Sequence, residues 1–204
     1  MRESIWVDVL HMNYLRCAAE ERCLSESAYL PANSNTTRKL LRLTTSVWNR
    51  GTVDFRPWQT SDRWEWHQCH SHYHSMAEFA HFDILTNDTF ERAAQGHKAS
   101  FCLEDSACQE SVTKTYRCTT EPSRSSPQGI SRGCADTYYA QYDCQWIDVT
   151  DVRPGAYFLR VSLNPLDRIA ELDLHNNHGV CHITLEERNA VVHGCFIPDD
   201  QFSP

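Results

Sequence analysis

The sequence contains no long apolar run. Across its 204 residues, no stretch approaches the roughly 20 consecutive apolar residues that a membrane-spanning helix requires. The segment from Met1 to Leu10 carries Arg2, Glu3 and Asp8 and has no apolar core, so it does not have the pattern of a secretory signal peptide. We therefore expect no membrane span, and no export signal at the start of this chain.

The chain also lacks an excess of positive charge. It has 19 lysine and arginine residues against 27 aspartate and glutamate residues, so the formal net charge is −8 with histidine neutral. This balance disfavours nucleic acid as a partner and weakly favours cationic partners. Hydrophobic residues make up 41% and charged residues 23% of the chain, which is ordinary globular usage and argues against wholesale disorder.

Cysteine is abundant, but the C-x-x-C spacing is missing. The closest cysteines are six residues apart, which disfavours zinc ribbons and thioredoxin-like motifs. An even count of ten predicts five disulfides formed in an oxidising compartment, whereas the alternative is ten buried thiols in a cytosolic protein. Asn35 and Asn87 begin candidate glycosylation tripeptides, which agree with secretion. Together these features suggest a fragment of a longer secreted precursor.

The pattern of apolar and β-branched residues predicts a mostly β fold. We expect a compact, β-rich single domain with long disulfide-stapled loops and few short helices. A short helix is expected within residues 9–30, ending near Cys23. Strands are expected at 40–47, 64–73, 81–85, 145–149, 157–163 and 181–185, with turns at 87–88 and 153–155 and a long loop at 119–133.

Four of the eleven histidines lie within residues 67–74. In an extended segment alternate side chains share a face, so His70, His72 and His74 would point one way and His67 the other. On a helix, His70 and His74 would align and His72 would face away. A three-histidine site thus implies a strand here, and three imidazoles on one face suit Cu(II), Zn(II) or Ni(II).

The alternative for this run is a surface cluster of histidines without a metal. The interleaved residues Trp64, Trp66, Cys69 and Tyr73 argue against that alternative, because such residues prefer burial. The ligands alone do not separate copper from zinc, since affinity favours copper and availability often favours zinc.

Three motifs in and after this run resemble those of the lysyl oxidase family. They are WEWHQCHSHYHSM at 64–76, GHKASFCLED at 96–105 and DCQWIDVTDV at 143–152. The similarity extends from about Tyr14 to Cys195, and several such motifs in the right order exclude coincidence. We therefore expect residues 14–204 to form a lysyl oxidase-like copper amine oxidase catalytic domain, preceded by a poorly matched N-terminal extension at 1–13.

The resemblance implies a copper centre and a quinone cofactor. The copper ligands would be His70, His72 and His74, with zinc as the substitute in an unprocessed form. The cofactor would be lysine tyrosylquinone, formed from Lys98 and Tyr138 of the same chain. Without the resemblance, Lys98 would be taken for a solvated surface lysine and Tyr138 for an ordinary packing tyrosine.

The implied activity is that of a secreted protein-lysine 6-oxidase. Such an enzyme uses molecular oxygen to convert peptidyl lysine in matrix proteins, such as collagen and elastin, to allysine. Ammonia and hydrogen peroxide are released, and the aldehydes lead to cross-linking. The quinone would condense with the substrate amine and acidify its α-C–H bond. The sequence does not identify the base that removes this proton; His81, His97 and Asp136 are candidates, each with a structural role as the alternative.

The resemblance also implies a disulfide pairing, which spacing alone does not choose. The implied pairs are Cys17–Cys69, Cys23–Cys144, Cys102–Cys118, Cys108–Cys134 and Cys181–Cys195. One of these links would anchor the cysteine beside the first histidine ligand.

A second candidate site is the acidic segment 171–177. Its hard oxygen ligands Glu171, Asp173, Asn176 and Asn177 suit Ca²⁺, and the alternative is an acidic turn with asparagine capping. The resemblance favours calcium, because lysyl oxidase-like members bind calcium at the corresponding motif.

Two other functions compete with the oxidase. One is a non-enzymatic extracellular interaction module stabilised by metal and disulfides, or an unprocessed precursor lacking the quinone. The other is a zinc hydrolase, although no H-E-x-x-H motif supports it. The chain departs from the family at Phe82, where a tyrosine is usual, and at Gln95, where glutamate is common, but it retains every ligand and cofactor precursor.

Overall fold

Strands make up most of the regular structure of the chain. The structure is a computed structural model that describes residues 5–119 and 127–198, without the side chains of residues 77, 78 and 97–101. The strands are β1 (Ile5–His11), β2 (Thr37–Leu43), β3 (Thr45–Trp48), β4 (Glu65–His67), β5 (His72–His74), β6 (Met76–Thr86), β7 (Arg92–Phe101), β8 (Ala107–Cys108), β9 (Cys134–Tyr138), β10 (Trp146–Asp148), β11 (Gly155–Leu163), β12 (His178–Leu185) and β13 (Ala190–Phe196).

Helices are few and short, as the sequence predicts. They are the α-helix α1 (Arg16–Glu20) and the 3₁₀ turns η1 (Met12–Tyr14), η2 (Glu26–Tyr29), η3 (Pro31–Asn33) and η4 (Ser61–Arg63). None of the helices in the described part of the chain is long and apolar enough to cross a bilayer. The prediction of a mostly β fold with long, disulfide-linked loops is confirmed.

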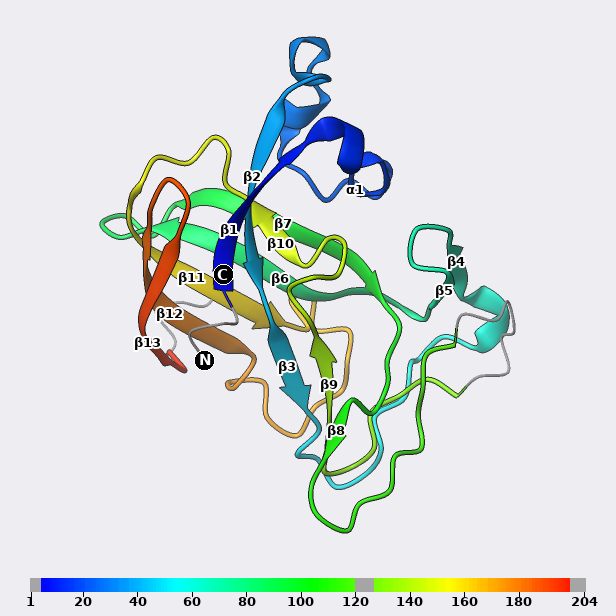
Figure 1. Cartoon of the computed structure of the whole chain (residues 1–204). Helices are drawn as coiled ribbons and strands as arrows, with labels where there is room; N and C mark the ends of the chain where they lie inside the picture. Colours follow the sequence, from blue (N-terminus) through cyan, green and yellow to red (C-terminus); the bar gives the residue numbers. More distant parts are fainter. Residues whose placement is uncertain (1–4, 120–126, 199–204) are drawn as a thin grey trace.

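Within residues 5–119 and 127–198, the strands form three sheets and one separate hairpin (Figure 1). The largest sheet is five-stranded, with the order β13-β12-β11-β6-β7 and antiparallel neighbours throughout. Two smaller sheets have the orders β1-β2-β10 and β3-β9-β8, and β4 pairs with β5 in a two-stranded hairpin. In the view of Figure 1, β2 continues almost directly into β3, so one ribbon links the two smaller sheets across the front of the large one.

The main core lies between the sheets. Its largest fully buried side chains come from two sheets, such as Leu41 of β2 and Ile147 of β10 from one sheet and Phe82 of β6 from the five-stranded sheet. At one point two strands approach so closely that only glycine fits. A Cβ added to Gly96 of β7 would lie 2.8 Å from both Ile147 Cγ1 and the Trp146 carbonyl oxygen of β10. This contact fixes β7, which carries Lys98, against β10.

Two local predictions were wrong in part. The predicted helix within 9–30 is only Arg16–Glu20, and residues up to His11 belong to strand β1, which pairs with β2 along its whole length. The predicted strand 64–73 is interrupted by a turn at residues 68–71, where Ser71 N–H donates to the His67 carbonyl at 2.8 Å. Ser71 has φ 53°, a left-handed conformation. Glycine or asparagine at this position would have predicted it, but serine does not.

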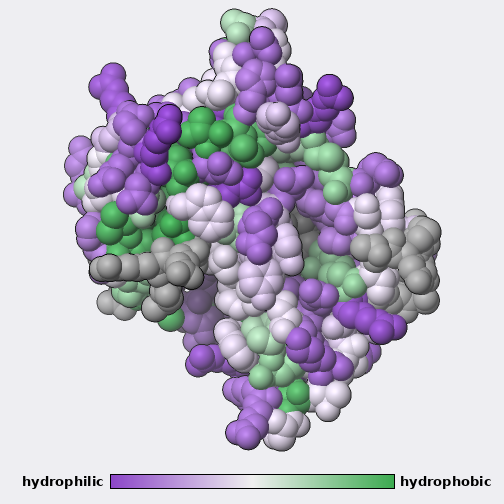
Figure 2. Space-filling view, viewed as in Figure 1, coloured by the Kyte–Doolittle hydropathy of each residue, from purple (hydrophilic) through white to green (hydrophobic). Residues whose placement is uncertain are grey.

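The other predicted strands correspond to β2 and β3, β6, β10, β11 and β12, and the predicted turn at 87–88 joins β6 to β7. Residues 120–126 of the predicted loop 119–133 lie outside the described residues. The face shown in Figure 2 is largely hydrophilic, with apolar patches between polar side chains.

All ten cysteines are joined in five disulfides. The pairs are Cys17–Cys69, Cys23–Cys144, Cys102–Cys118, Cys108–Cys134 and Cys181–Cys195, so the pairing implied by the family is confirmed. The links with the largest sequence separations, 52 and 121 residues, start from either end of α1 and reach the histidine turn and the segment before β10. They hold parts of the chain that local structure alone would not bring together.

Candidate functional site

The hairpin formed by β4, β5 and the turn at 68–71, here called the histidine hairpin, brings the three predicted metal ligands close to one another. His70 lies in the turn and His72 and His74 lie on β5. His74 Nε2 is 3.1 Å from His70 Nδ1 and 3.0 Å from His72 Nε2. His74 is only 5% exposed, so its ring is largely removed from bulk water, whereas His70 and His72 are half-buried.

Each of these two separations suits a pair of ligands of one small ion. Two imidazole nitrogens about 2.0 Å from one ion, at 90–110° to each other, are about 2.8–3.3 Å apart. Neutral imidazoles are also the nitrogen donors that copper and zinc accept. The His70–His74 pair and the His72–His74 pair therefore each have the spacing and the donor chemistry of copper or zinc ligands.

His67 was predicted to point away from the other histidines, and this prediction was wrong. Its ring stacks on the ring of His74 with centroids 3.7 Å apart and planes at 17°. One nitrogen each from His67, His70 and His74 also lies within 4.8 Å of the other two. The strict alternation that would separate them holds for a continuous strand, whereas here the turn at 68–71 contains His70 and separates His67 from His72 and His74.

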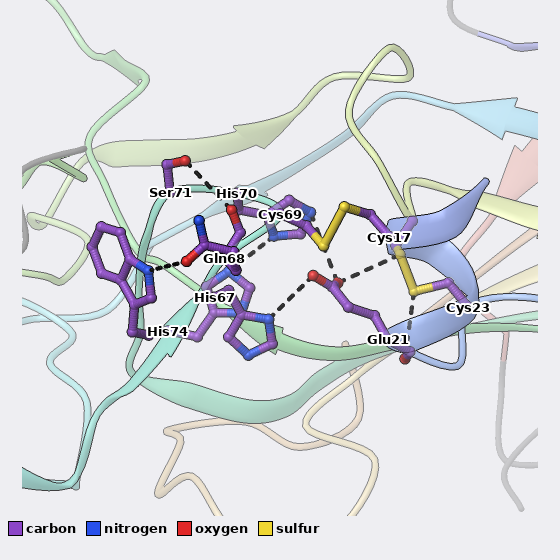
Figure 3. The surroundings of a disulfide bond; sticks show 11 residues. Cys17, Glu21, Cys23, His67, Gln68, Cys69, His70, Ser71 and His74 are labelled. Atoms are coloured by element: carbon purple, nitrogen blue, oxygen red, sulfur yellow. Dashed lines mark hydrogen bonds and ion pairs between the residues drawn. A yellow bond between two sulfur atoms is a disulfide. The ribbon is translucent and has the colours of Figure 1, made fainter. Parts of the chain in front are cut away.

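A carboxylate that the sequence did not single out faces the same histidines. Glu21 directly follows α1, and its Oε1 lies 3.2 Å from His67 Nδ1 while its Oε2 lies 3.8 Å from His70 Nε2. Figure 3 shows Glu21 reaching from α1 toward the histidines beside the Cys17–Cys69 disulfide. The sequence does not identify Glu21 as part of this site, because 46 residues separate it from His67.

The predicted cofactor tyrosine is buried in a different sheet. Tyr138 ends β9 and is 6% exposed. Its hydroxyl donates to Asp136 Oδ2 at 2.6 Å and lies 3.3 Å from the Cys102 carbonyl oxygen. Burial and then the Asp136 carboxylate raise the pKa of Tyr138 well above its ordinary value.

Asp136 is itself an unusual carboxyl. It is 2% exposed and accepts hydrogen bonds from the Glu104 backbone N–H and the Ser106 hydroxyl as well as from Tyr138. Burial raises the pKa of Asp136 to about 6, although these hydrogen bonds oppose the rise. A carboxyl in this range exchanges a proton near neutral pH, which suits it to proton transfer with the phenol.

Tyr138 lines a cavity of about 190 Å³ whose walls are mostly apolar. The same cavity is lined by Ala80 of β6, which is the register partner of Lys98 on β7. The backbone of Lys98 is thus one strand away from the cavity wall. The Lys98 side chain lies outside the described residues.

The predicted calcium ligands fall into two hydrogen-bonded pairs in the loop between β11 and β12. Asn177 Nδ2 donates to Glu171 Oε1 at 3.0 Å, while Asn176 Nδ2 lies 3.4 Å from Asp173 Oδ2. The buried Asn164, which the sequence did not single out, also donates to Glu171 Oε1, at 2.8 Å. Calcium binding by this loop stays a prediction.

Both candidate glycosylation sites lie in exposed turns. Asn35 precedes β2, and Asn87 lies between β6 and β7. These positions are accessible to a glycosyltransferase, and glycosylation stays a prediction.

Comparisons with known proteins agree on one family. The lysyl oxidase family model matches residues 1–195. The chain is 48% identical to Lysyl oxidase homolog 1 of Homo sapiens over 97% of its own length and 34% of that protein. It is 48% identical to Protein-lysine 6-oxidase of Rattus norvegicus, covering 97% of this chain and 47% of that protein.

The corresponding protein of Sus scrofa, also a Protein-lysine 6-oxidase, is 47% identical, over 97% of this chain and 78% of its own length. The chain spans between about a third and a half of the length of the first relatives it matches. On the match of the family model and these identities, the chain belongs to the lysyl oxidase family.

Proposed function

We propose that this chain is the catalytic domain of a copper-dependent protein-lysine 6-oxidase, which converts peptidyl lysine to allysine with release of ammonia and hydrogen peroxide. The observation that carries the proposal is the meeting of His70, His72 and His74 around His74 Nε2 in a chain of the lysyl oxidase family. These three histidines would hold copper, and Lys98 and Tyr138 would supply the quinone.

Bound copper and the finished quinone would supply the redox chemistry, accepting two electrons from the amine and passing them to molecular oxygen. The protein's own part begins with Tyr138. Its phenol must lose a proton before it is oxidised, and the acceptor already bonded to it is Asp136 Oδ2 at 2.6 Å. Asp136, with a pKa of about 6, is largely ionised at pH 7 and can take that proton.

Protein lysines are the proposed substrates, with extracellular matrix proteins of the collagen and elastin type as partners. Several of the relatives carry the name Protein-lysine 6-oxidase, which supports a protein lysine as substrate. The net charge of −8 favours approach of lysine-rich segments. Five disulfides support secretion into an oxidising extracellular space.

Peptide mass mapping of the copper-loaded, oxygen-exposed protein tests the proposal. We expect a cross-linked peptide that joins Lys98 to Tyr138, and amine-dependent release of hydrogen peroxide. Lys98→Arg should abolish both while one copper ion per chain is retained. Two unmodified peptides from copper-loaded protein, or peroxide release that survives Lys98→Arg, would contradict the cofactor assignment and favour a non-enzymatic module or an unprocessed precursor.

A further inference from the structure

We infer that Glu21 is a positioning residue of the metal centre, whose carboxylate orients the imidazoles of His67 and His70. The inference rests on the proposed copper site and adds to it a residue from a distant helix. Glu21 would act through the histidines rather than as a ligand.

The two carboxylate oxygens divide between two histidines. Oε1 lies 3.2 Å from His67 Nδ1, within hydrogen-bonding distance, and Oε2 lies 3.8 Å from His70 Nε2, at ion-pair distance. The Glu21 side chain is 15% exposed, and those of His67 and His70 are 20% and 14% exposed. Limited contact with water strengthens the attraction between the carboxylate and these rings.

The two nitrogens of His70 face different groups. Nδ1 lies 3.1 Å from His74 Nε2, on the side where the proposed ligands meet, and Nε2 faces Glu21. A histidine that binds a metal through one nitrogen commonly donates its other N–H to a carboxylate, which fixes the tautomer and the ring orientation. Glu21 is placed to have this effect on His70, with Nδ1 left free of its proton for the metal.

His67 extends the same control to His74. Its Nδ1 faces Glu21, and its ring lies flat on the His74 ring at a centroid distance of 3.7 Å. A ring held by the carboxylate on one side and packed on a ligand on the other restricts the rotation of that ligand. The Glu21 carboxylate thus orients His70 directly and His74 through His67, which are two of the three proposed ligands.

The backbone that carries Glu21 is held firmly. The Glu21 N–H donates to the Cys17 carbonyl oxygen at 2.9 Å, which closes the last turn of α1. Cys17 is bonded to Cys69, the residue before His70 (Figure 3), and Cys23 is bonded to Cys144. A covalent link therefore joins the helix of the carboxylate to the turn of the histidine, so the spacing between them is set by the fold.

Glu21→Gln, with Glu20→Gln as the matched control, tests the inference. Glu20 is the preceding residue and is exposed, so both variants remove one negative charge from the same helix end. The readouts are the dissociation constant for Cu(II), measured by competition with a chelator, and the Cu(II) electron paramagnetic resonance spectrum. We expect Glu21→Gln to weaken binding about 10–100-fold and to change the spectrum, and Glu20→Gln to change neither.

The wild type and His74→Ala separate failure of this inference from failure of the proposed function. If His74→Ala binds Cu(II) as the wild type does, the proposed copper site is wrong. If His74→Ala loses the metal but Glu21→Gln keeps the wild-type affinity within twofold and the same spectrum, only the role of Glu21 is overturned. Folding of each variant is checked by circular dichroism and by mapping the five disulfides.

Glu21→Asp keeps the test decisive should Glu21→Gln fail to fold. This variant keeps the charge but shortens the side chain by one methylene, so the carboxylate withdraws from His67 and His70. Partial loss of Cu(II) affinity with an altered spectrum supports the inference, and wild-type affinity with an unaltered spectrum overturns it.

Discussion

The hydroxyl of Tyr138 donates a hydrogen bond to Asp136 Oδ2, two residues earlier on the same strand, over 2.6 Å. Alternate residues of a strand share a face, so the pair arises from the local backbone and does not depend on a distant segment. Asp136 is only 2% exposed to solvent, and burial makes its carboxyl group costly to ionise. The proposed cofactor precursor therefore sits beside a proton acceptor whose charge depends on pH.

Asp136→Asn should change how stability depends on pH. The pKa of Asp136 is raised from 3.8 to about 6, so between these values the folded state binds more protons than the unfolded state. Wild-type stability should therefore fall relative to the variant as pH rises from about 4 to 6.5, by on the order of 3 kcal/mol. Urea unfolding of both proteins across this pH range measures the difference in their free energies of unfolding. The exposed residue Asp143 provides a control, since Asp143→Asn should show no such trend.

Asp105→Asn should show the opposite pH trend. Burial alone would raise the pKa of Asp105, but hydrogen bonds from Thr115, Ser131 and Tyr116 outweigh it and the pKa lies below 3.8. The carboxylate should thus stabilise the fold above pH 4 and lose this effect as pH falls through its lowered pKa. At pH 7 we expect the variant to be about 2–3 kcal/mol less stable, by urea denaturation. A loss that stays constant down to pH 3 would contradict this account.

Removal of the disulfide beside the histidine turn should weaken metal binding. Cys17→Ser with Cys69→Ser frees α1 from the turn that holds His70. The chelator-competition assay should give a dissociation constant for Cu(II) about tenfold higher. The control is Cys181→Ser with Cys195→Ser, which opens the link between β12 and β13. That variant should lose stability without losing Cu(II) affinity, and equal losses of affinity in both would contradict the role of the first link.

Gly96→Ala should destabilise the fold, whereas Gly179→Ala should not. The added methyl at residue 96 would lie 2.8 Å from Ile147 Cγ1 and from the Trp146 carbonyl oxygen, so β7 and β10 must separate. We expect a loss of about 1–3 kcal/mol. Among the described residues other than its chain neighbours, no heavy atom lies within 4 Å of the equivalent methyl at residue 179, where the change should stay within about 0.5 kcal/mol. Thermal unfolding compares the two, and similar melting temperatures would contradict the close approach of β7 and β10.

Much of the fold was predictable because its signals are local. Runs of β-branched and apolar residues predict β2, β6, β10, β11 and β12, since a strand needs only its own residues to show the pattern. Ten cysteines without a C-x-x-C spacing predict disulfides by count. Their pairing came from the family resemblance, because separations from 14 to 121 residues carry no local signal.

In the histidine run, the sequence determines which candidate ligands are present, and the tertiary structure determines which of them lie close together. The alternation of its histidines and the interleaved aromatic residues predict a metal site, because such residues prefer burial and imidazoles on one face suit a metal ion. The backbone of this run contains a turn that its residue types do not predict. Because of this turn, the ring of His67 stacks on the ring of His74. Glu21 reached the same histidines from 46 residues away, through a helix and a disulfide. Sequence spacing determines local geometry, whereas packing and covalent links determine which distant side chains meet.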